Sequence, residues 1–313
     1  MTTSRLAGVD IGTLTCRLLI ADFSPDVPLK ELRSERRILR LGEGVDQSKR
    51  LDSAAMDRVI QCLKEWREVI DSYRVNACTA VGTSAVRDAV NREEFLDRVR
   101  RDTGFEIEIL TGEEEARRTM LGIRSGLPPS VTEMLALDIG GGSTEFIFDR
   151  PGHKPIVRSI DVGVVRLCER VLHHDPPTAE EIQRARDWIR RDTELAVAAI
   201  PRRPEQTFVG TAGTITSLTA MAQKLSTYQP ARIHNYRLAL NTVRDIEQQL
   251  LGLTKAQRVG LPGLEKNREE VIAAGAIIIR TIMETLDQQS VLVSDLGLRE
   301  GVLIDLSVRT RSM

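Results

Sequence analysis

The sequence lacks any segment long and apolar enough to cross a membrane or to direct secretion. Its longest apolar run lies near Val271–Ile279, well short of the ~20 residues that a membrane-spanning helix needs. The N-terminal Met-Thr-Thr-Ser-Arg leads directly into a strand-like segment, without the basic stretch, apolar run and small-residue cleavage site of a secretory signal. We therefore expect no membrane partner and a cytoplasmic location.

The sequence also has few cysteines and almost no net charge. The four cysteines contain no CxxC pair, which gives little support to a disulfide scaffold or a zinc site, and we expect each to be a small buried side chain. Because 44 Lys and Arg residues balance 45 Asp and Glu residues, the molecule as a whole has no field that attracts polyanions. A nucleic-acid duplex is not an expected partner, and any phosphate-rich ligand must be held at a local site.

The sequence also has few histidines that could bind a metal or act in catalysis. The chain has four histidines, two of them adjacent in His173-His174-Asp175. Adjacent side chains generally project in different directions, and no third ligand stands at metal spacing, so we interpret this segment as a solvated loop. No Ser-His-Asp or Cys-His arrangement and no nucleophile elbow is visible.

The sequence does have alternating strand-like and helix-like segments over its 313 residues. This length suggests about two domains, and the alternation favours an α/β fold over a helical bundle. Strands are predicted at Leu6–Asp10, Cys16–Ala21, Val75–Val81, Phe105–Leu110, Met134–Ile139, Glu145–Phe148, Thr207–Val209 and Val291–Val293. Helices are predicted to begin at Ser53, as a candidate N-cap, near Glu270 and near Leu298, and, with a capping-box glutamate, at Asn91, Thr111 and Thr178.

An internal repeat organises the sequence. Gly8–Thr15 (GVDIGTLT) recurs as Ala136–Ser143 (ALDIGGGS), and the same offset relates Leu18–Ile20 to Phe146–Phe148. Each copy is a strand that ends in Asp, a turn rich in Gly, Thr or Ser, and a second strand. The period is too long for a solenoid, whose units run to ~20–50 residues. Two copies predict duplicated halves that each offer one turn to a shared cleft.

The turns of this repeat are candidate phosphate-binding segments. Small residues there leave backbone N–H groups and hydroxyls accessible to an anion. One such turn could simply be a tight hairpin, but two at matching places, with a third between a later strand and helix, favour a polyphosphoryl ligand. The candidate residues are Gly12, Thr13 and Thr15 in the first turn, Gly140, Gly141, Gly142, Ser143 and Thr144 in the second, and Gly210, Thr211, Gly213 and Thr214 in the third.

Three acidic residues beside these turns are candidate metal ligands. Asp10 and Asp138 end the first strand of each copy, and Glu145 begins the return strand of the second copy. Phosphoryl transfer needs a hard cation to neutralise the phosphate oxygens, and Mg²⁺ prefers carboxylates and water. Alternatively, these acids only cap turns or face solvent.

Thr111-Gly112-Glu113-Glu114-Glu115 opens a predicted helix with three acids in succession. Thr111 and Glu114 have the spacing of a capping box, and Glu114 can pair with Arg118 four residues on, so Glu114 has a structural role. Glu115 lies about 100° further round the helix. It is a candidate base for an attacking water, which must lose a proton as it reaches phosphorus. A solvated acid on the first helical turn is the alternative.

Two arginines, Arg17 and Arg87, follow phosphate-type turns, the second after Gly82-Thr83-Ser84. A guanidinium group can grip phosphate oxygens with two hydrogen bonds. A surface ion pair is the alternative for both.

Taken in order, these motifs resemble the exopolyphosphatase/guanosine pentaphosphate phosphatase family, whose superfold is shared by actin, heat-shock ATPases and sugar kinases. The resemblance covers nearly the whole chain, and the ordered set of motifs is specific to the family. The motifs are Asp10-Ile-Gly-Thr, Thr83-Ser-Ala-Val-Arg-Asp-Ala89, Gly112-Glu-Glu-Glu-Ala-Arg117, Asp138-Ile-Gly-Gly-Gly-Ser-Thr-Glu145, Gly163-Val-Val-Arg-Leu167, Asp175-Pro-Pro177, Gly210-Thr-Ala-Gly-Thr214 and Ser294-Asp-Leu-Gly-Leu-Arg-Glu-Gly301.

The resemblance implies two ribonuclease-H-like (actin-like ATPase) domains with the active site in an interdomain cleft. With a Gly-, Pro- and Ser-rich hinge near residues 124–132, this places domain I at 1–125, completed by the last helix at 298–313, and domain II at 126–297. It also implies that Glu115 is the base, that Asp138 and Glu145 are the magnesium-site residues, and that Arg17, Arg87 and Arg268 contact the phosphate chain or nucleotide. The expected reaction releases terminal orthophosphate from polyphosphate or guanosine pentaphosphate.

Two departures from the family bear on the substrate. Leu14 stands where many members have a polar residue, usually Asn, and the additional C-terminal helical region of larger members is not seen, which favours short polyphosphates or the nucleotide. A polyphosphate/ADP kinase of the same superfold and a non-catalytic alarmone-binding sensor are the alternative functions. The sequence leaves open a homodimer and a requirement for a monovalent cation.

Overall fold

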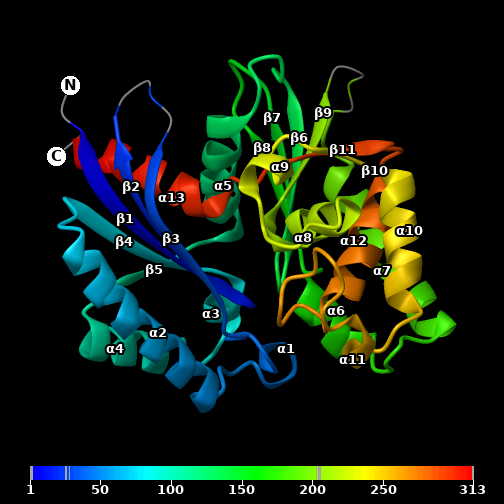
Figure 1. Cartoon of the computed structure of the whole chain (residues 1–313), viewed down its shortest axis with the longest axis horizontal. Helices are drawn as coiled ribbons and strands as arrows, with labels where there is room; N and C mark the ends of the chain where they lie inside the picture. The colour runs from blue at the N-terminus through cyan, green and yellow to red at the C-terminus, as the bar shows by residue number, and fades with distance from the viewer. Residues whose placement is uncertain (1–2, 25–26, 28, 202, 204–205, 312–313) are drawn as a thin grey trace. The chain divides into compact units, whose positions relative to one another are not determined.

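The computed structural model describes residues 3–24, 27, 29–201, 203 and 206–311. The chain divides into two compact units, one formed by Met1–Gly126 with Leu296–Met313 and the other by Leu127–Asp295. Figure 1 labels the helices and strands of both units. Among the described residues, no helix is both long and apolar enough to span a bilayer.

Unit 1 is built on a five-stranded sheet in the order β3-β2-β1-β4-β5, with β1 antiparallel to β2 and parallel to β4. The strands are β1 (Ser4–Ile11), β2 (Thr15–Phe23), β3 (Lys30–Ile38), β4 (Ala77–Gly82) and β5 (Ile107–Ile109). The helices are α1 (Val45–Ser48), α2 (Ser53–Ser72), α3 (Ser84–Asp88), α4 (Arg92–Thr103), α5 (Gly112–Gly126) and the C-terminal α13 (Leu298–Arg311).

Alternation along β1 sends side chains to two different layers. Val9 and Ile11 join the core formed with α2 and α4, whereas Leu6 packs with Leu303 of α13 on the other face of the sheet. The lack of a side chain at Gly8 admits Leu303, whose Cδ2 would lie 3.0 Å from a Cβ at that position. The last helix is therefore an integral layer of unit 1.

Unit 2 is built on a six-stranded sheet in the order β10-β11-β9-β6-β7-β8. Its strands are β6 (Met134–Ile139), β7 (Thr144–Asp149), β8 (Ile156–Ile160), β9 (Thr207–Thr211), β10 (Arg237–Ala239) and β11 (Ser290–Val293). Its helices are α6 (Val164–Arg170), α7 (Ala179–Val197), α8 (Ala212–Ala222), α9 (Pro230–Ile233), α10 (Leu240–Leu251), α11 (Lys255–Arg258) and α12 (Ile272–Thr285). The nearly all-apolar α12 is the buried centre, in contact with α6, α7, α8 and α10.

The internal repeat is folded as two matching hairpins, β1–β2 and β6–β7. Asp10 pairs in register with Arg17, and Asp138 pairs with Glu145. The same hydrogen bond closes both turns: Gly12 N–H donates to the carbonyl of Thr15 (3.1 Å), and Gly140 N–H donates to the carbonyl of Ser143 (2.9 Å). Each hairpin is flanked by a parallel strand in the same relative position, β4 beside β1 and β9 beside β6. The prediction of duplicated hairpins is confirmed.

Two predicted helix caps are wrong, although both helices begin where the sequence predicted. The N-cap of α2 is Asp52, whose carboxylate accepts from the N–H of Ala55, and Ser53 is the first helical residue. Asn91 makes no side-chain cap on α4, because its amide instead accepts from the N–H of Leu51 and donates to that residue's carbonyl. The Asn91 side chain therefore binds a neighbouring loop, whereas the spacing in the sequence predicted that it caps the helix.

The capping box at Thr178 and Glu181, which opens α7, is confirmed. Burial disfavours the charge on the Glu181 carboxylate, yet hydrogen bonds from His174 and from backbone N–H groups outweigh it and lower the pKa of Glu181 to about 2. His173 and His174 are exposed, as predicted for a solvated loop, but both donate their N–H groups to Glu181. The loop is fixed by the helix that follows it.

The four cysteines are free thiols. Cys16 and Cys62 are buried, as expected, whereas Cys78 and Cys168 are only partly buried. Burial raises the pKa of Cys62 to about 12 and that of Cys78 to about 11, which lowers the fraction of reactive thiolate near neutral pH.

Candidate functional site

The first turn, in unit 1, is tied to two neighbouring segments. The carbonyl of Thr13 accepts from Gly42 N–H (2.9 Å), and that of Leu14 accepts from the N–H groups of Leu39 and Arg40 (both 3.0 Å). The Thr13 hydroxyl bonds the hydroxyl of Ser84, at the start of α3, over 2.8 Å. The Gly12–Thr15 turn and the Gly82-Thr83-Ser84 turn, predicted separately, therefore form one cluster.

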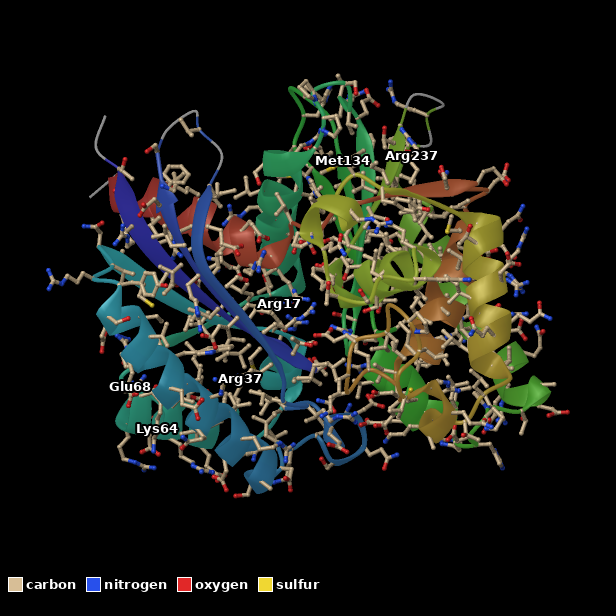
Figure 2. All side chains as sticks on the ribbon, in the orientation of Figure 1. Arg17, Arg37, Lys64, Glu68, Met134 and Arg237 are labelled. Atoms are coloured by element: carbon tan, nitrogen blue, oxygen red, sulfur yellow. The ribbon has the colours of Figure 1, made fainter. Side chains whose placement is uncertain are left out.

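Beside this turn, three charged residues lie in one row across the sheet. Asp10 is in register with Arg17 on β2, and Arg17 is in register with Arg36 on β3. Residues directly opposite each other share a face of the sheet, and an Arg17 nitrogen lies 3.8 Å from an Asp10 oxygen. Figure 2 labels Arg17 and Arg37. The row carries two cations and one anion, which favours an anionic ligand.

Arg37, next to Arg36 on β3, belongs to the opposite face of the sheet. Its guanidinium binds Glu65 of α2 and lies 5.8 Å from the centre of the Trp66 ring. This face packs on α2, so Arg37 is a structural residue, whereas Arg17 and Arg36 lie on the face that carries α13.

The candidate base Glu115 lies on the first turn of α5 and is 9% exposed. Arg87 of α3 donates to a Glu115 carboxylate oxygen (3.2 Å) and to the carbonyl of Leu110 (2.7 Å). The structure thus brings together two residues that were predicted separately, from different motifs. The Arg87 guanidinium therefore fixes the position of the Glu115 carboxylate through a charge-assisted hydrogen bond.

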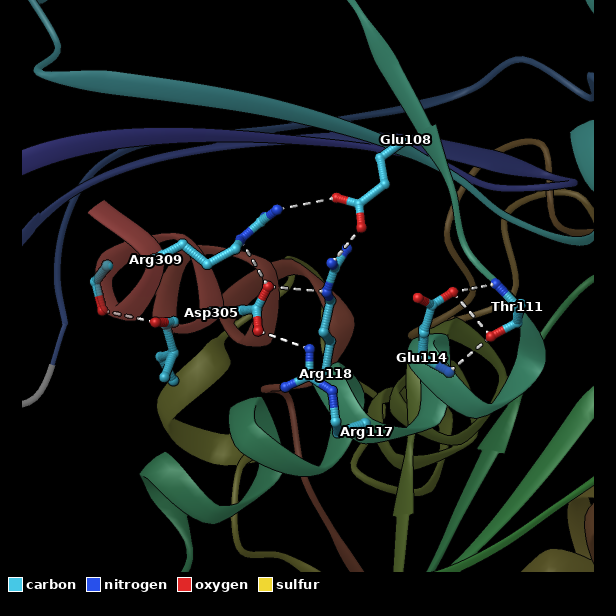
Figure 3. Close-up of polar contacts among 9 residues, drawn as sticks. Glu108, Thr111, Glu114, Arg117, Arg118, Asp305 and Arg309 are labelled. Atoms are coloured by element: carbon cyan, nitrogen blue, oxygen red, sulfur yellow. Dashed lines mark hydrogen bonds and ion pairs between the residues drawn. The ribbon is translucent and has the colours of Figure 1, made fainter. Parts of the chain in front are cut away.

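Glu114, the neighbour of Glu115, has the structural role predicted for it. Its carboxylate accepts from the N–H and hydroxyl of Thr111 (both 2.8 Å), and Thr111 accepts from Glu114 N–H. The Thr111 N–H and hydroxyl lower the pKa of the Glu114 carboxyl. The expected pairing with Arg118 is wrong, because Arg118 binds Glu108 (2.5 Å) and Asp305 of α13 (3.1 Å) instead (Figure 3).

In unit 2, the Gly140–Ser143 turn is bound by the segment that starts α6. The carbonyl of Gly140 accepts from Val164 N–H (3.0 Å), and that of Gly141 accepts from Val165 N–H (2.9 Å). The carbonyl of Gly142 accepts from the side chain of Arg166 (2.8 Å). Within the described part of the chain, the N–H groups of Gly141, Gly142 and Ser143 donate to no protein acceptor. Donors of this kind suit an anion.

Asp138 lies between two of the other candidate residues of unit 2. It is in register with Glu145 on β7 and with Thr211 on β9. Glu145 is 2% exposed, and the hydroxyl of Ser159 on β8 donates to it over 2.8 Å. Two carboxylates on one face of a sheet repel each other unless a cation lies between them, so this pair is a candidate metal site.

The third predicted turn is a direct junction between β9, which ends at Thr211, and α8, which begins at Ala212. Thr211 is the N-cap of α8 and makes no side-chain cap there. Arg268, 3% exposed, lies against this turn, because a Cβ on Gly213 would overlap its guanidinium group. Arg268 also donates to Glu265 (2.7 Å). The structure therefore places Arg268 beside a turn that is distant in the sequence.

Sequence reasoning missed three residues of these clusters: Arg36, Gly163 and Arg166. Arg36 lies on β3, a charged strand with no apolar alternation. Gly163 has no room for a Cβ, which would overlap the backbone of Gly141 and Gly142. The motif Gly163–Leu167 was visible in the sequence, but no local pattern links it to the turn that it binds.

The chain is similar to known proteins over nearly its full length. The model of the Ppx/GppA phosphatase family matches residues 19–310. Exopolyphosphatase 2 of Mycobacterium tuberculosis is 35% identical, covering 98% of this chain and 100% of the relative. The crystal structure of the Aquifex aeolicus member of the Ppx/GppA family superimposes with a TM-score of 0.83 at 34% identity, covering 99% of each chain.

A crystal structure of an exopolyphosphatase from Cytophaga hutchinsonii superimposes with a TM-score of 0.88 at 27% identity, covering 96% of this chain and 97% of the other. Together with the Aquifex structure, this likeness confirms the predicted fold, a two-domain α/β protein of the actin-like ATPase type.

Proposed function

The chain belongs to the Ppx/GppA phosphatase family, and on that premise we propose that it hydrolyses the terminal phosphoryl group of inorganic polyphosphate or of guanosine pentaphosphate. The observation that carries the proposal is the end of the β6–β7 hairpin. There, unused backbone N–H groups and an opposed pair of carboxylates adjoin one another. Such a combination fits a phosphate group together with a divalent cation.

Asp138 and Glu145 fit Mg²⁺, which binds through one or two carboxylates and completes its shell with water and phosphate oxygens. Among the described residues, no cluster of three or more His, Cys, Asp and Glu side chains has metal-binding geometry, so water and phosphate oxygens would supply most of the ligands. Bound there, Mg²⁺ would neutralise charge on the phosphate oxygens. Asp10, which is paired with Arg17, is the weaker ligand candidate.

In the proposed reaction, Glu115 accepts a proton from the water that attacks the terminal phosphorus. The bond from that phosphorus to the bridging oxygen breaks, the bridging oxygen stays on the shortened chain, and the terminal phosphoryl group is released as orthophosphate. Arg87 orients the Glu115 carboxylate through their 3.2 Å hydrogen bond. The N–H groups of the Gly140–Ser143 turn and the guanidinium groups of Arg17 and Arg268 bind phosphate oxygens. Four free thiols suit the cytoplasm, the compartment that we propose.

Orthophosphate release from a panel of substrates tests this function. The panel is tripolyphosphate, long-chain polyphosphate, guanosine pentaphosphate and ATP, each with and without Mg²⁺. We expect magnesium-dependent release from at least one of the first three. ATP formation from polyphosphate and ADP would instead identify a kinase, and tight binding of guanosine pentaphosphate without release would identify a sensor.

Glu115→Gln tests the assignment of the base. Because general-base catalysis contributes ~10²–10⁴-fold, we expect phosphate release to fall by a factor in that range, while calorimetric binding of tripolyphosphate stays near the wild-type value. Glu113→Gln, an exposed neighbour on the same helix, is the matched control. Near-normal turnover in Glu115→Gln would show that another group is the base.

A further inference from the structure

Three successive peptide carbonyls of the Gly140–Ser143 turn are all held by one segment, residues 163–166. Three of the donors are backbone N–H groups, those of Val164, Val165 and Arg166, and they bind the carbonyls of Gly140 and Gly141. The fourth donor is the side-chain Nε–H of Arg166, which binds the carbonyl of Gly142. Of these four hydrogen bonds, only the last depends on the identity of a side chain.

Holding the carbonyls also fixes the direction of the adjacent N–H groups. In a planar trans peptide, the carbonyl of one residue and the N–H of the next point in opposite directions. The only cis peptide among the described residues is Asp175–Pro176, so this applies throughout the turn. Binding the carbonyls of Gly140, Gly141 and Gly142 on one side therefore turns the N–H groups of Gly141, Gly142 and Ser143 to the other.

The direction of the Ser143 N–H is easily lost because the residue before it is a glycine. Without a Cβ, Gly142 can adopt backbone conformations that other residues cannot, so the Gly142–Ser143 peptide can rotate unless its carbonyl is held. Arg166 holds it with a hydrogen bond from a charged donor, the stronger class of such bonds. Arg166 is 7% exposed, so water does not readily replace it.

Resting on the function proposed above, we propose that Arg166 is a positioning residue for phosphate binding. By holding the Gly142 carbonyl, Arg166 keeps the N–H of Ser143 directed at the phosphoryl group. It also keeps the Gly142 carbonyl oxygen, which would repel the phosphate oxygens, away from that group. Gly163 supports the same contact, because a Cβ there would overlap the carbonyl of Gly141 and push the segment away. Arg166 acts through the turn and need not touch the substrate.

The test compares Arg166→Gln and Arg166→Ala with Arg158→Gln. Arg158 is an exposed residue of β8 whose side chain, within the part of the chain that the structure describes, donates to the carbonyl of Val157 alone. With tripolyphosphate as substrate, we expect kcat/KM to fall ~10–100-fold in both Arg166 variants, the range typical of groups that orient a binding residue, mainly through a higher KM. Guanidinium chloride in the millimolar range should restore part of the loss in Arg166→Ala and have no such effect on Arg158→Gln.

Binding is measured separately from turnover, by calorimetry with tripolyphosphate in the Glu115→Gln background. We expect Arg166→Gln to weaken binding by a similar factor. If either Arg166 variant unfolds, Arg166→Lys replaces it, because lysine keeps the charge but cannot place a donor at the Nε position; weaker binding with a near-wild-type Tm supports the proposal. Wild-type binding by the folded Arg166 variants would overturn it. A wild-type enzyme that releases no orthophosphate from any substrate would instead overturn the proposed function.

Discussion

The two hairpins of the repeat share their backbone geometry and differ in charge. In unit 1, the row across the sheet is Asp10, Arg17 and Arg36; in unit 2, the corresponding row is Asp138, Glu145 and Ser159. The first row has a net positive charge and the second has two carboxylates. Duplication therefore preserved the turn, while substitution at the position next to each aspartate made one row suited to anions and the other to cations.

The two turns also differ in how they are held. In unit 1, backbone N–H groups of residues 39–42 bind the carbonyls of Thr13 and Leu14. In unit 2, the backbone bonds from residues 164 and 165 are joined by the side chain of Arg166. In both units a glycine, Gly42 or Gly163, lies too close to the turn to carry a Cβ. In the second turn a side chain therefore holds a backbone carbonyl, whereas the side-chain contact of the first turn joins the hydroxyls of Thr13 and Ser84.

Removing one carboxylate of the pair in unit 2 should reduce the main difference between the hairpins. Glu145→Gln removes one negative charge from the unit 2 row, so we expect weaker Mg²⁺ binding. We also expect kcat to fall about 1,000-fold, which corresponds to several kcal/mol of charge stabilisation. The increase in Tm on adding Mg²⁺ should also disappear. Glu194→Gln, an exposed residue of α7, is the control. An unchanged magnesium dependence would exclude Glu145 as a ligand.

Unit 1 depends on its C-terminal helix in a way that can be measured. Asp305 of α13 binds Arg117 (2.7 Å), Arg118 (3.1 Å) and Arg309 (3.2 Å) (Figure 3). Asp305→Asn leaves the buried Arg118 guanidinium with less compensation, so we expect the free energy of unfolding in urea to fall by about 3 kcal/mol. Arg309→Gln removes only a half-exposed partner and should change it by less than ~1 kcal/mol. Equal effects would contradict a role for burial.

Glu181 is a buried acid with a structural role, so its substitution should change stability, whereas substitution of Glu145 should change activity. Because its pKa is lowered to about 2 in the folded state, its charge stabilises the protein above the unfolded-state pKa of ~4.3. This contribution should fade as the pH falls from there toward the folded-state value. Glu181→Gln should lower the stability at pH 7 by about 3 kcal/mol, with the difference from wild type vanishing below pH ~2. A loss of kcat without a loss of stability would refute the assignment.

The smallest expected effect concerns the positive row of unit 1. Arg36→Gln removes one of its cations, and we expect KM for polyphosphate to rise by up to ~5-fold, as for a partly screened charge worth ~1 kcal/mol. Arg33→Gln is the control, because Arg33 lies on the same strand in register with Ile20, a residue of the core on the opposite face. An equal change in both variants would mean that only the net charge of the strand matters.

Local signals in the sequence were sufficient for much of the fold. The repeat located both hairpins, and the capping boxes at Thr111 and Thr178 located the starts of α5 and α7. The edge strand β3 was missed, because its charged sequence KELRSERRI follows no apolar alternation and is held by pairing with β2. The partner of Arg118 was also mispredicted, since Asp305 is distant in the chain and outcompetes the local Glu114.

The sequence by itself determined the duplicated hairpins, the glycine-rich turns and the acidic residues next to them, because these depend on residues adjacent in the chain. Only the tertiary structure decided which side chains meet: Arg87 with Glu115, Arg268 with the Gly210–Thr214 turn, and Arg166 with the carbonyl of Gly142. Such pairs are fixed by the register of strands and the packing of helices. A spacing rule cannot anticipate them, because the energy that selects each partner comes from contacts distant in the sequence.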